Sequence, residues 1–303
     1  MLNFQRIHEN MYRITGCGCD CYLIDGSEPC LIDCGCCREN IREYAEQVIG
    51  KTVDTVICTH SHIDHTENAG YFSHVYMTEK TAATAKNPMD EPPENLMLQY
   101  EPEFVVDGQI IAVGKLELQI IECNCHCPGN IMILDTRDNI LFTGDEIDRD
   151  QVLLLPGFSE RQRQYHSSPA ATVNDYREML IRLLPYRPFV QCLCTGHNGS
   201  PLPFSAIDEM IALCDEILSG EEGSLDCSSK TYPPEMTHFP SLESNYRRCT
   251  RHGYSLVYCA DDLYDRSRNS TNAPATRLHR MCEENLRRQK SKHLSDSGTA
   301  PVS

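Results

Sequence analysis

The sequence predicts an α/β domain in which short buried strands alternate with amphipathic helices. Apolar runs of strand length, such as Val53–Cys58, recur between turn residues, and residues 38–49 place apolar side chains at helical spacing. Several of the predicted strands end beside a glycine and a potential metal ligand. Because strand ends can meet at one edge of a sheet, we expect the loops that carry these ligands to converge there.

The first strands are predicted at Met11–Ile14, Cys19–Ile24 and Pro29–Asp33, with a hairpin turn at residues 25–27. Asp33 ends the last of them.

A helix is predicted next, over Arg38–Ile49, and Gly50 is placed to end it. We expect the strand Val53–Cys58 to follow, then a short helix at 66–72 and a strand at Val75–Met77.

Four potential metal ligands lie within six residues directly after the strand Val53–Cys58. His60 and His62 are two residues apart, so in extended backbone they point to the same side and can approach one ion. The turn beyond carries Asp64 and His65 to a second position. This density indicates one crowded ion or two ions roughly 3.5 to 4 Å apart.

Three later strands also end at potential ligands. The hairpin formed by Ile110–Val113 and Leu116–Cys123 leads to His126, and the hairpin formed by Ile131–Asp135 and Ile140–Thr143 leads to Asp145. The strand Phe189–Thr195 leads to Gly196 and His197. We expect the two hairpins to form a second sheet, and helices at 173–184 and 204–218 to cover the sheets.

Over about residues 10 to 220 the sequence resembles the metallo-beta-lactamase fold superfamily. The resemblance rests on an ordered set of motif residues: Asp33, His60, His62, Asp64, His65, His126, Asp145 and His197. It implies a four-layer αββα sandwich with a binuclear site at one edge of the two sheets.

The resemblance also implies the role of each residue. The first metal would be held by His60, His62 and His126, the second by Asp64, His65 and His197, and Asp145 would bridge both. Asp33 would support the ligands by hydrogen bonds. The cofactors implied are two divalent metal ions, expected to be zinc; iron and manganese suit the same ligands.

Two residues help to indicate which branch of the superfamily the sequence resembles. Cys127 stands where members commonly have Thr or Ser, which leaves the ligands intact. His62 stands where the flavin-linked diiron branch usually carries a carboxylate, which favours the hydrolase branch.

The function implied is hydrolysis of a small thioester, lactone or ester by a hydroxide that bridges the metals, with Asp64 and Asp145 as catalytic residues. A mononuclear iron enzyme resembling persulfide dioxygenases is the alternative, because those relatives share the HxHxDH motif. A phosphodiesterase or nuclease is a third hypothesis, and a non-catalytic binding protein a fourth that the complete ligand set disfavours.

The charge of the chain indicates which kinds of partner it can bind. The net charge is −17, and residues 1–246 hold 16 Lys and Arg against 38 Asp and Glu, or −22, while residues 247–303 hold 11 against 6, or +5. Such an acidic body repels polyanions, so we expect a small-molecule substrate and no nucleic acid. The oligomeric state is not predicted.

No long apolar run and no apolar leader occurs, so we expect no membrane association and a cytoplasmic location. In that compartment the 18 cysteines are expected to be reduced and mostly packed as small apolar side chains.

We predict a catalytic domain at 1–220 and a C-terminal extension at 221–290. The extension is expected to include an edge strand at Tyr254–Cys259 and a helix at 277–290, and residues 291–303 to be a disordered tail. Residues 87–103 are predicted to form a surface loop and residues 146–171 to be irregular.

Overall fold

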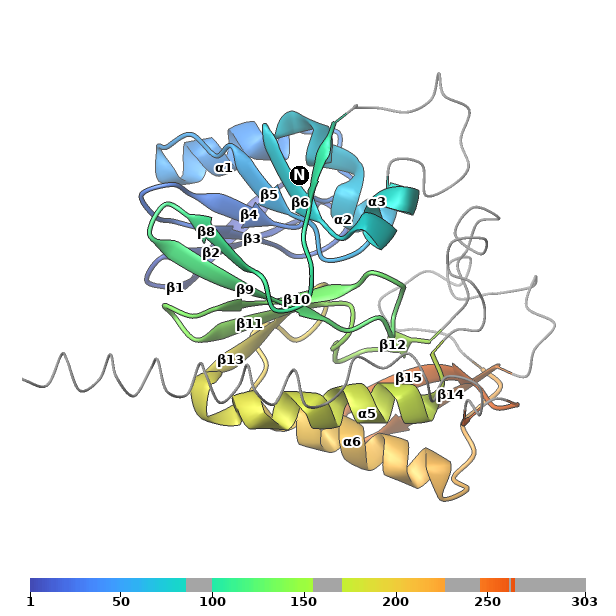
Figure 1. Cartoon of the computed structure of the whole chain (residues 1–303). Helices are drawn as coiled ribbons and strands as arrows, with labels where there is room; N and C mark the ends of the chain where they lie inside the picture. The colour runs from blue at the N-terminus through green and yellow to red at the C-terminus, as the bar shows by residue number, and fades with distance from the viewer. Residues whose placement is uncertain (86–99, 155–170, 227–245, 262, 265–303) are drawn as a thin grey trace, which may run out of the picture.

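In a computed structural model of the chain, two β-sheets face each other and helices cover the outer face of each sheet (Figure 1). The structure describes residues 1–85, 100–154, 171–226, 246–261 and 263–264. The predicted helix at 277–290, the predicted tail and most of the predicted surface loop lie outside these ranges. The four-layer αββα arrangement predicted from the sequence is confirmed.

The first sheet has seven strands in chain order. They are β1 (Asn3–His8), β2 (Met11–Thr15), β3 (Cys21–Ile24), β4 (Cys30–Ile32), β5 (Thr55–Ile57), β6 (His74–Met77) and β7 (Pro102–Phe104). Pairing is antiparallel from β1 to β4 and parallel from β4 to β7. The carboxyl ends of β4 and β5 therefore lie at one edge, which brings the residues after Ile32 beside those after Ile57.

Helices lie on the outer face of this sheet (Figure 1). They are α1 (Ile41–Ile49), α2 (Ile63–Thr66), the 3₁₀ helix η1 (Glu67–Tyr71) and α3 (Glu79–Ala85). The side chain of Asn40 accepts hydrogen bonds from the first turn of α1, and Gly50 ends the helix in the left-handed conformation at φ 69°. The predicted end of α1 is thus confirmed.

The second sheet has the order β13-β11-β10-β9-β8. Its strands are β8 (Ile110–Val113), β9 (Leu116–Glu122), β10 (Ile131–Asp135), β11 (Ile140–Gly144) and β13 (Cys192–Thr195). The strands β11 and β13 are parallel, so the loops after them, which carry Asp145 and His197, leave the sheet at the same edge.

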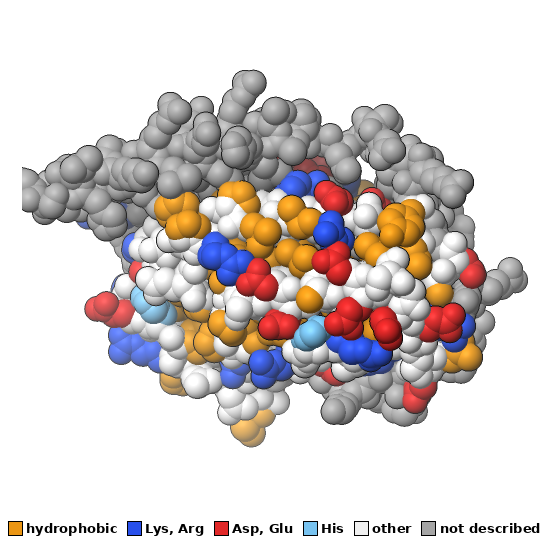
Figure 2. All heavy atoms as spheres, turned by 90° about the horizontal axis from the view of Figure 1, so that it is seen from below, with side chains coloured by type: hydrophobic (Ala, Val, Ile, Leu, Met, Phe, Trp, Pro, Cys, Tyr) orange, Lys and Arg blue, Asp and Glu red, His pale blue; other side chains and the backbone are white. Residues whose placement is uncertain are grey.

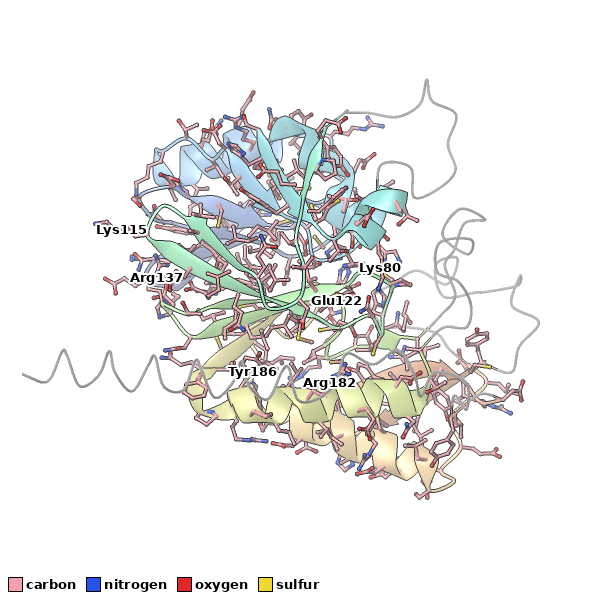
Figure 3. All side chains as sticks on the ribbon, in the orientation of Figure 1. Lys80, Lys115, Glu122, Arg137, Arg182 and Tyr186 are labelled. Atoms are coloured by element: carbon pink, nitrogen blue, oxygen red, sulfur yellow. The ribbon has the colours of Figure 1, made fainter. Side chains whose placement is uncertain are left out.

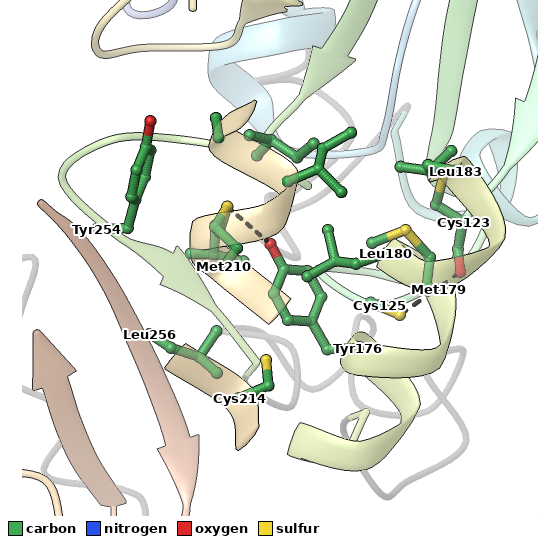
Figure 4. Close-up of a cluster of buried hydrophobic side chains, with 14 of the residues drawn as sticks. Cys123, Cys125, Tyr176, Met179, Leu180, Leu183, Met210, Cys214, Tyr254 and Leu256 are labelled. Carbon is green, nitrogen blue, oxygen red and sulfur yellow. Dashed lines mark hydrogen bonds between the residues drawn. The ribbon is translucent and has the colours of Figure 1, made fainter. Parts of the chain in front are cut away.

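The outer face of the second sheet is covered by α5 (Val173–Leu183), the 3₁₀ helix η3 (Leu184–Phe189) and α6 (Ser205–Leu218). Tyr176 of α5 is fully buried against α6, and its hydroxyl lies 3.5 Å from the sulfur of Met210 (Figure 4). The surface of this side of the molecule intersperses acidic and basic side chains (Figure 2), in keeping with ion pairs that join the helical segments, such as Arg177 with Asp215.

A third, small sheet has the order β12-β15-β14, with β12 at Val152–Leu153, β14 at Tyr246–Arg251 and β15 at Tyr254–Cys259. The predicted strand Tyr254–Cys259 is present, but it is the middle strand of this sheet and not an edge strand. Its Leu256 is fully buried and belongs to the same core as α5 and α6. Part of the predicted extension is therefore packed against the helices that cover the second sheet.

Among the elements that the sequence analysis missed are the strands β1, β7, β12 and β14 and the helix α3. Four of the six residues of β1 are exposed and α3 is short and rich in Thr and Ala, so neither shows a clear apolar pattern. The helix α3 nevertheless ties the two sheets together, because Lys80 pairs with Glu122 at the end of β9, 3.1 Å away (Figure 3). No helix in the described part of the chain has both the length and the apolarity needed to cross a bilayer.

Candidate metal centre

The predicted ligands of the first metal come together at the edge where the sheets meet. The Nε2 atom of His60 and the Nε2 atom of His126 each lie 3.0 Å from Nδ1 of His62. One atom of each of these imidazoles and one oxygen of Asp145 lie within 4.8 Å of one another. Burial lowers the pKa of all three imidazoles, to about 3 for His62, so they are neutral at physiological pH.

Hydrogen bonds decide which ring nitrogen of each histidine faces the site. The Nδ1 atom of His126 donates to the carbonyl of Leu153 at 3.0 Å. The Nδ1 atom of His60 lies 3.0 Å from Oγ1 of Thr59, whose own proton goes to Asp33 at 2.9 Å. A neutral imidazole that donates through Nδ1 presents a lone pair at Nε2. The Nε2 lone pairs of His60 and His126 can therefore bind a cation.

The predicted ligands of the second metal form an adjoining group. The Nε2 atom of His197 lies 3.3 Å from Oδ2 of Asp64, and that of His65 lies 3.5 Å from Nε2 of His197. Burial alone would lower the pKa of His197, but the carboxylates of Asp145 and Asp64 raise it well above its usual value. Burial would also lower the pKa of His65, but Cys19 and the carboxylates of Asp145, Asp33 and Asp64 raise it well above its usual value. This group therefore attracts positive charge.

Asp145 lies between the two groups. Its Oδ2 is 3.5 Å from Nε2 of His126 and 3.3 Å from Nε2 of His197, and its Oδ1 is 3.3 Å from Nε2 of His65. Oδ1 is buried and faces Nε2 of His65. A Cβ atom at Gly196 would overlap this oxygen, so only glycine allows the approach. Asp145 thus contacts histidines of both groups, and its bridging of two metal ions stays a prediction.

Each of the two groups offers side chains that could hold a metal ion. In the first group the Nε2 atoms of His60 and His126, which carry no proton, each lie 3.0 Å from Nδ1 of His62, so a proton or a cation must lie between these nitrogens. In the second group two carboxylates draw protons onto two buried histidines. Divalent ions would take the place of these protons. Which ions bind, and how many, stays a prediction.

Asp33 supports the second group from behind. Its Oδ1 accepts from the backbone N–H of Thr59 at 2.7 Å, and its Oδ2 accepts from Nδ1 of His65 at 2.8 Å. Cys19 lies close enough to both to form a third cluster of potential ligands. Both oxygens of Asp33 and Nδ1 of His65 are already engaged, however, so this cluster is a support for His65 and not a separate metal site.

Sequence reasoning missed two buried carboxylates, Glu146 and Asp148, which bind the loops of the ligands. Glu146 is fully buried, and burial raises its pKa to about 7. Asp148 is 2% exposed. Their placement two residues apart in a predicted irregular segment gave no signal beyond their closeness to Asp145. The Leu153 carbonyl was also missed, because backbone contacts leave no mark on residue type.

Comparisons with known proteins agree with this geometry. The sequence model of the metallo-beta-lactamase superfamily matches residues 14–197. A metallo-beta-lactamase from Pontibacter korlensis is 17% identical, with a TM-score of 0.54 over 71% of this chain and 99% of its own. One from Erythrobacter litoralis is 16% identical, with a TM-score of 0.51 over 71% and 96%. A stereoselective inverting sec-alkylsulfatase from Pseudomonas is 14% identical, with a TM-score of 0.56 over 78% of this chain and 46% of its own. At these identities the solved structures establish a common fold.

Proposed function

This chain belongs to the metallo-beta-lactamase superfamily, whose members are in general metal-dependent hydrolases, and on this premise we propose that it hydrolyses a small thioester, lactone or ester at a site for two divalent metal ions. The observation that carries the proposal is the position of Asp145, whose carboxylate contacts histidines of both ligand groups at 3.3 to 3.5 Å. Zinc is the ion we propose, since imidazole and carboxylate ligands suit it.

The protonation states of these ligand residues suit metal binding even in the absence of an ion. Burial keeps the imidazoles of His60, His62 and His126 neutral, so their lone pairs are available. Interaction with His197 and His65 outweighs burial and holds the pKa of Asp145 well below its usual range, so its carboxylate is ionised. Bound divalent ions would supply an ionised water near neutral pH and would polarise the scissile carbonyl.

Asp64 is the residue placed to handle the leaving group. Its side chain is 26% exposed, whereas those of the histidines around it are 8% exposed or less. Burial alone would raise its pKa, but His65 and His197 hold that pKa well below the usual value. Asp64 is therefore an ionised carboxylate at the open side of the site, where it can receive a proton and pass it to the departing thiol or alcohol.

The charge distribution favours an acyl substrate over a nucleic acid. The whole chain carries a net charge of −17, and residues 1–246 carry −22. A polyanionic backbone would be repelled by this field, whereas an uncharged ester or thioester carbonyl would not.

The proposal is tested first by metal content and then by turnover. We expect about two zinc ions per chain, the number that seven ligands imply, and hydrolysis of members of a panel of thioesters, lactones and activated esters. His60→Ala and Asp145→Ala should abolish that turnover. His74→Ala is the matched control, because His74 is a half-exposed histidine that pairs with Glu103 away from the site.

Full activity in the His60→Ala or Asp145→Ala protein would refute the proposal. One iron ion per chain, together with oxygen consumption on a persulfide and no hydrolysis, would instead support the dioxygenase alternative.

A further inference from the structure

The loop that follows Asp145 carries two buried acids, and each is bonded to the loop of a different ligand. Oε1 of Glu146 accepts from the backbone N–H of Cys125 at 2.8 Å and from that of His126 at 3.1 Å. Oδ2 of Asp148 accepts from the backbone N–H of Asn198, the residue after His197, at 2.6 Å. Both acids come from the strand end that also supplies the bridging carboxylate.

We propose that Glu146 and Asp148 are positioning residues, each for one half of the metal centre. Glu146 fixes the position of His126 in the first ligand group, and Asp148 fixes the position of His197 in the second. This inference rests on the proposed function, because it assumes that the two histidines hold metal ions. Neither acid is itself among the ligands, and each acts through backbone hydrogen bonds.

The backbone of Glu146 is also held in place, by a hydrogen bond from the helix α5. The hydroxyl of Tyr176 donates to the carbonyl of Glu146 at 2.6 Å, and Tyr176 is fully buried in α5. The loop of His126 is thus fastened, through Glu146, to the helical layer below the second sheet. Oε2 of Glu146 has no hydrogen-bond partner within the described residues, so only one oxygen of this carboxylate is used.

Asp148 uses both oxygens. Besides the bond from Oδ2 to Asn198, its Oδ1 accepts from the amide of the Asn198 side chain at 3.2 Å and from the backbone N–H of Asp150 at 2.8 Å. The backbone N–H of Gln151 adds a longer contact to Oδ1 at 3.4 Å. Every partner of this carboxylate is a donor, which fixes the direction of the loop that carries His197.

This difference makes amide substitutions informative. In Glu146→Gln the amide oxygen can keep both bonds of Oε1, and the amide nitrogen takes the place of the unpartnered Oε2. In Asp148→Asn the amide nitrogen must face a donor in either orientation, so a bond to Asn198 or to Asp150 is lost. We therefore expect Glu146→Gln to leave zinc affinity nearly unchanged and Asp148→Asn to lower it.

The experiment measures binding of zinc alone to metal-free protein, by competition with a chromophoric chelator, and needs no substrate. His197→Ala leaves the first half to be studied, and His60→Ala leaves the second. In the His197→Ala background, Glu146→Ala should weaken zinc binding about 10- to 100-fold, as expected for residues that orient metal ligands, and Asp148→Asn should not. In the His60→Ala background the result should be the reverse.

Asp135 provides a matched control. It is also a fully buried carboxylate whose Oδ1 accepts two backbone N–H groups, from Arg137 at 2.8 Å and from Asp138 at 3.2 Å, but it lies at the end of β10 remote from the ligands. We expect Asp135→Ala to leave zinc affinity unchanged. Circular dichroism would show which variants are folded, and Glu146→Gln and Asp148→Asn keep the test open if an alanine variant does not fold.

The outcomes separate the two proposals. If wild-type protein binds no zinc or other divalent metal, the proposed function and this inference both fail. If it binds two zinc ions and the three variants at positions 146 and 148 do not show the predicted asymmetry, only the inference fails. An equal loss in both halves would also overturn it, because that result indicates general destabilisation.

Discussion

Replacing Asp33 by Asn should disable one half of the metal centre while changing only one atom of the side chain. Oδ2 of Asp33 accepts from Nδ1 of His65 at 2.8 Å and from Oγ1 of Thr59 at 2.9 Å, and the residue is 2% exposed. If the amide oxygen introduced by Asp33→Asn keeps the bond to the backbone of Thr59, the amide nitrogen faces these two donors. His65 can then accept a bond at Nδ1 only by moving its proton to Nε2, the nitrogen that faces Asp145.

The cost follows from the bonds lost. Two hydrogen bonds to a buried carboxylate are removed, each worth roughly 1.5 to 3 kcal/mol, so the free energy of unfolding should fall by about 3 to 6 kcal/mol. For a chain of this size the lower figure corresponds to a decrease in Tm of roughly 6 to 12 °C. The affinity for zinc of the half that contains His65 should fall about 10- to 100-fold.

Thermal unfolding followed by circular dichroism, and zinc titration of the metal-free protein, measure both effects. Asp135→Asn is the control, since Asp135 is equally buried but its Oδ2 lies 3.6 Å from Arg137 and not beside a ligand, so this variant should keep the zinc affinity of the wild type even where it lowers the Tm. An Asp33→Asn protein with the Tm and zinc affinity of the wild type would show that His65 does not depend on this carboxylate.

Three further predictions concern the surroundings of the site. Removal of metal by a chelator should lower the Tm, because the carboxylates of Asp64 and Asp145 lose the positive charge they face; an unchanged Tm in a zinc-loaded sample would contradict this. Gly18→Ala should weaken zinc binding to the half that contains Asp64, because Gly18 has φ +101° and a Cβ atom there would lie 3.0 Å from Cβ of Asp64; zinc titration checks it. Burial raises the pKa of Asp20 to about 7, so the folded protein holds a proton that the unfolded chain releases above pH 4, and stability falls as the pH rises from about 4 to 7. Asp20→Asn should therefore stabilise the protein by up to about 4 kcal/mol at pH 8 and by less at pH 5, as measured by denaturant unfolding.

The positions of the ligands could be predicted because residue type and spacing along the chain identify side chains that can bind a metal. His60 and His62 follow a strand at the spacing that points them to one side, and Asp145 and His197 each stand next to a glycine at a strand end. Such signals are local, and the parallel pairing of β11 with β13 then brings the distant loops together.

The supports of the ligands could not be predicted, because they depend on contacts between distant segments. Glu146 and Asp148 have the composition of an exposed loop, and only the fold shows that they are buried beside the N–H groups of other loops. The strand β1 is likewise defined by its pairing with β2, since four of its six side chains are exposed and show no apolar alternation.

The pairing of β12 with β15 indicates when, during synthesis of the chain, the metal centre can be completed. The carbonyl of Leu153 holds the ring of His126, and β12, which contains Leu153, is paired with β15, the last described strand. His197 is the last ligand to be made, yet the partner of β12 is complete only at Cys259, which is 259 − 197 = 62 residues later. At translation rates of about 5 to 20 residues per second this interval is roughly 3 to 12 s. During that interval the nascent chain would display all seven ligands without the strand that secures one of them, so we expect the ion to be acquired late, after the ribosome has released β15.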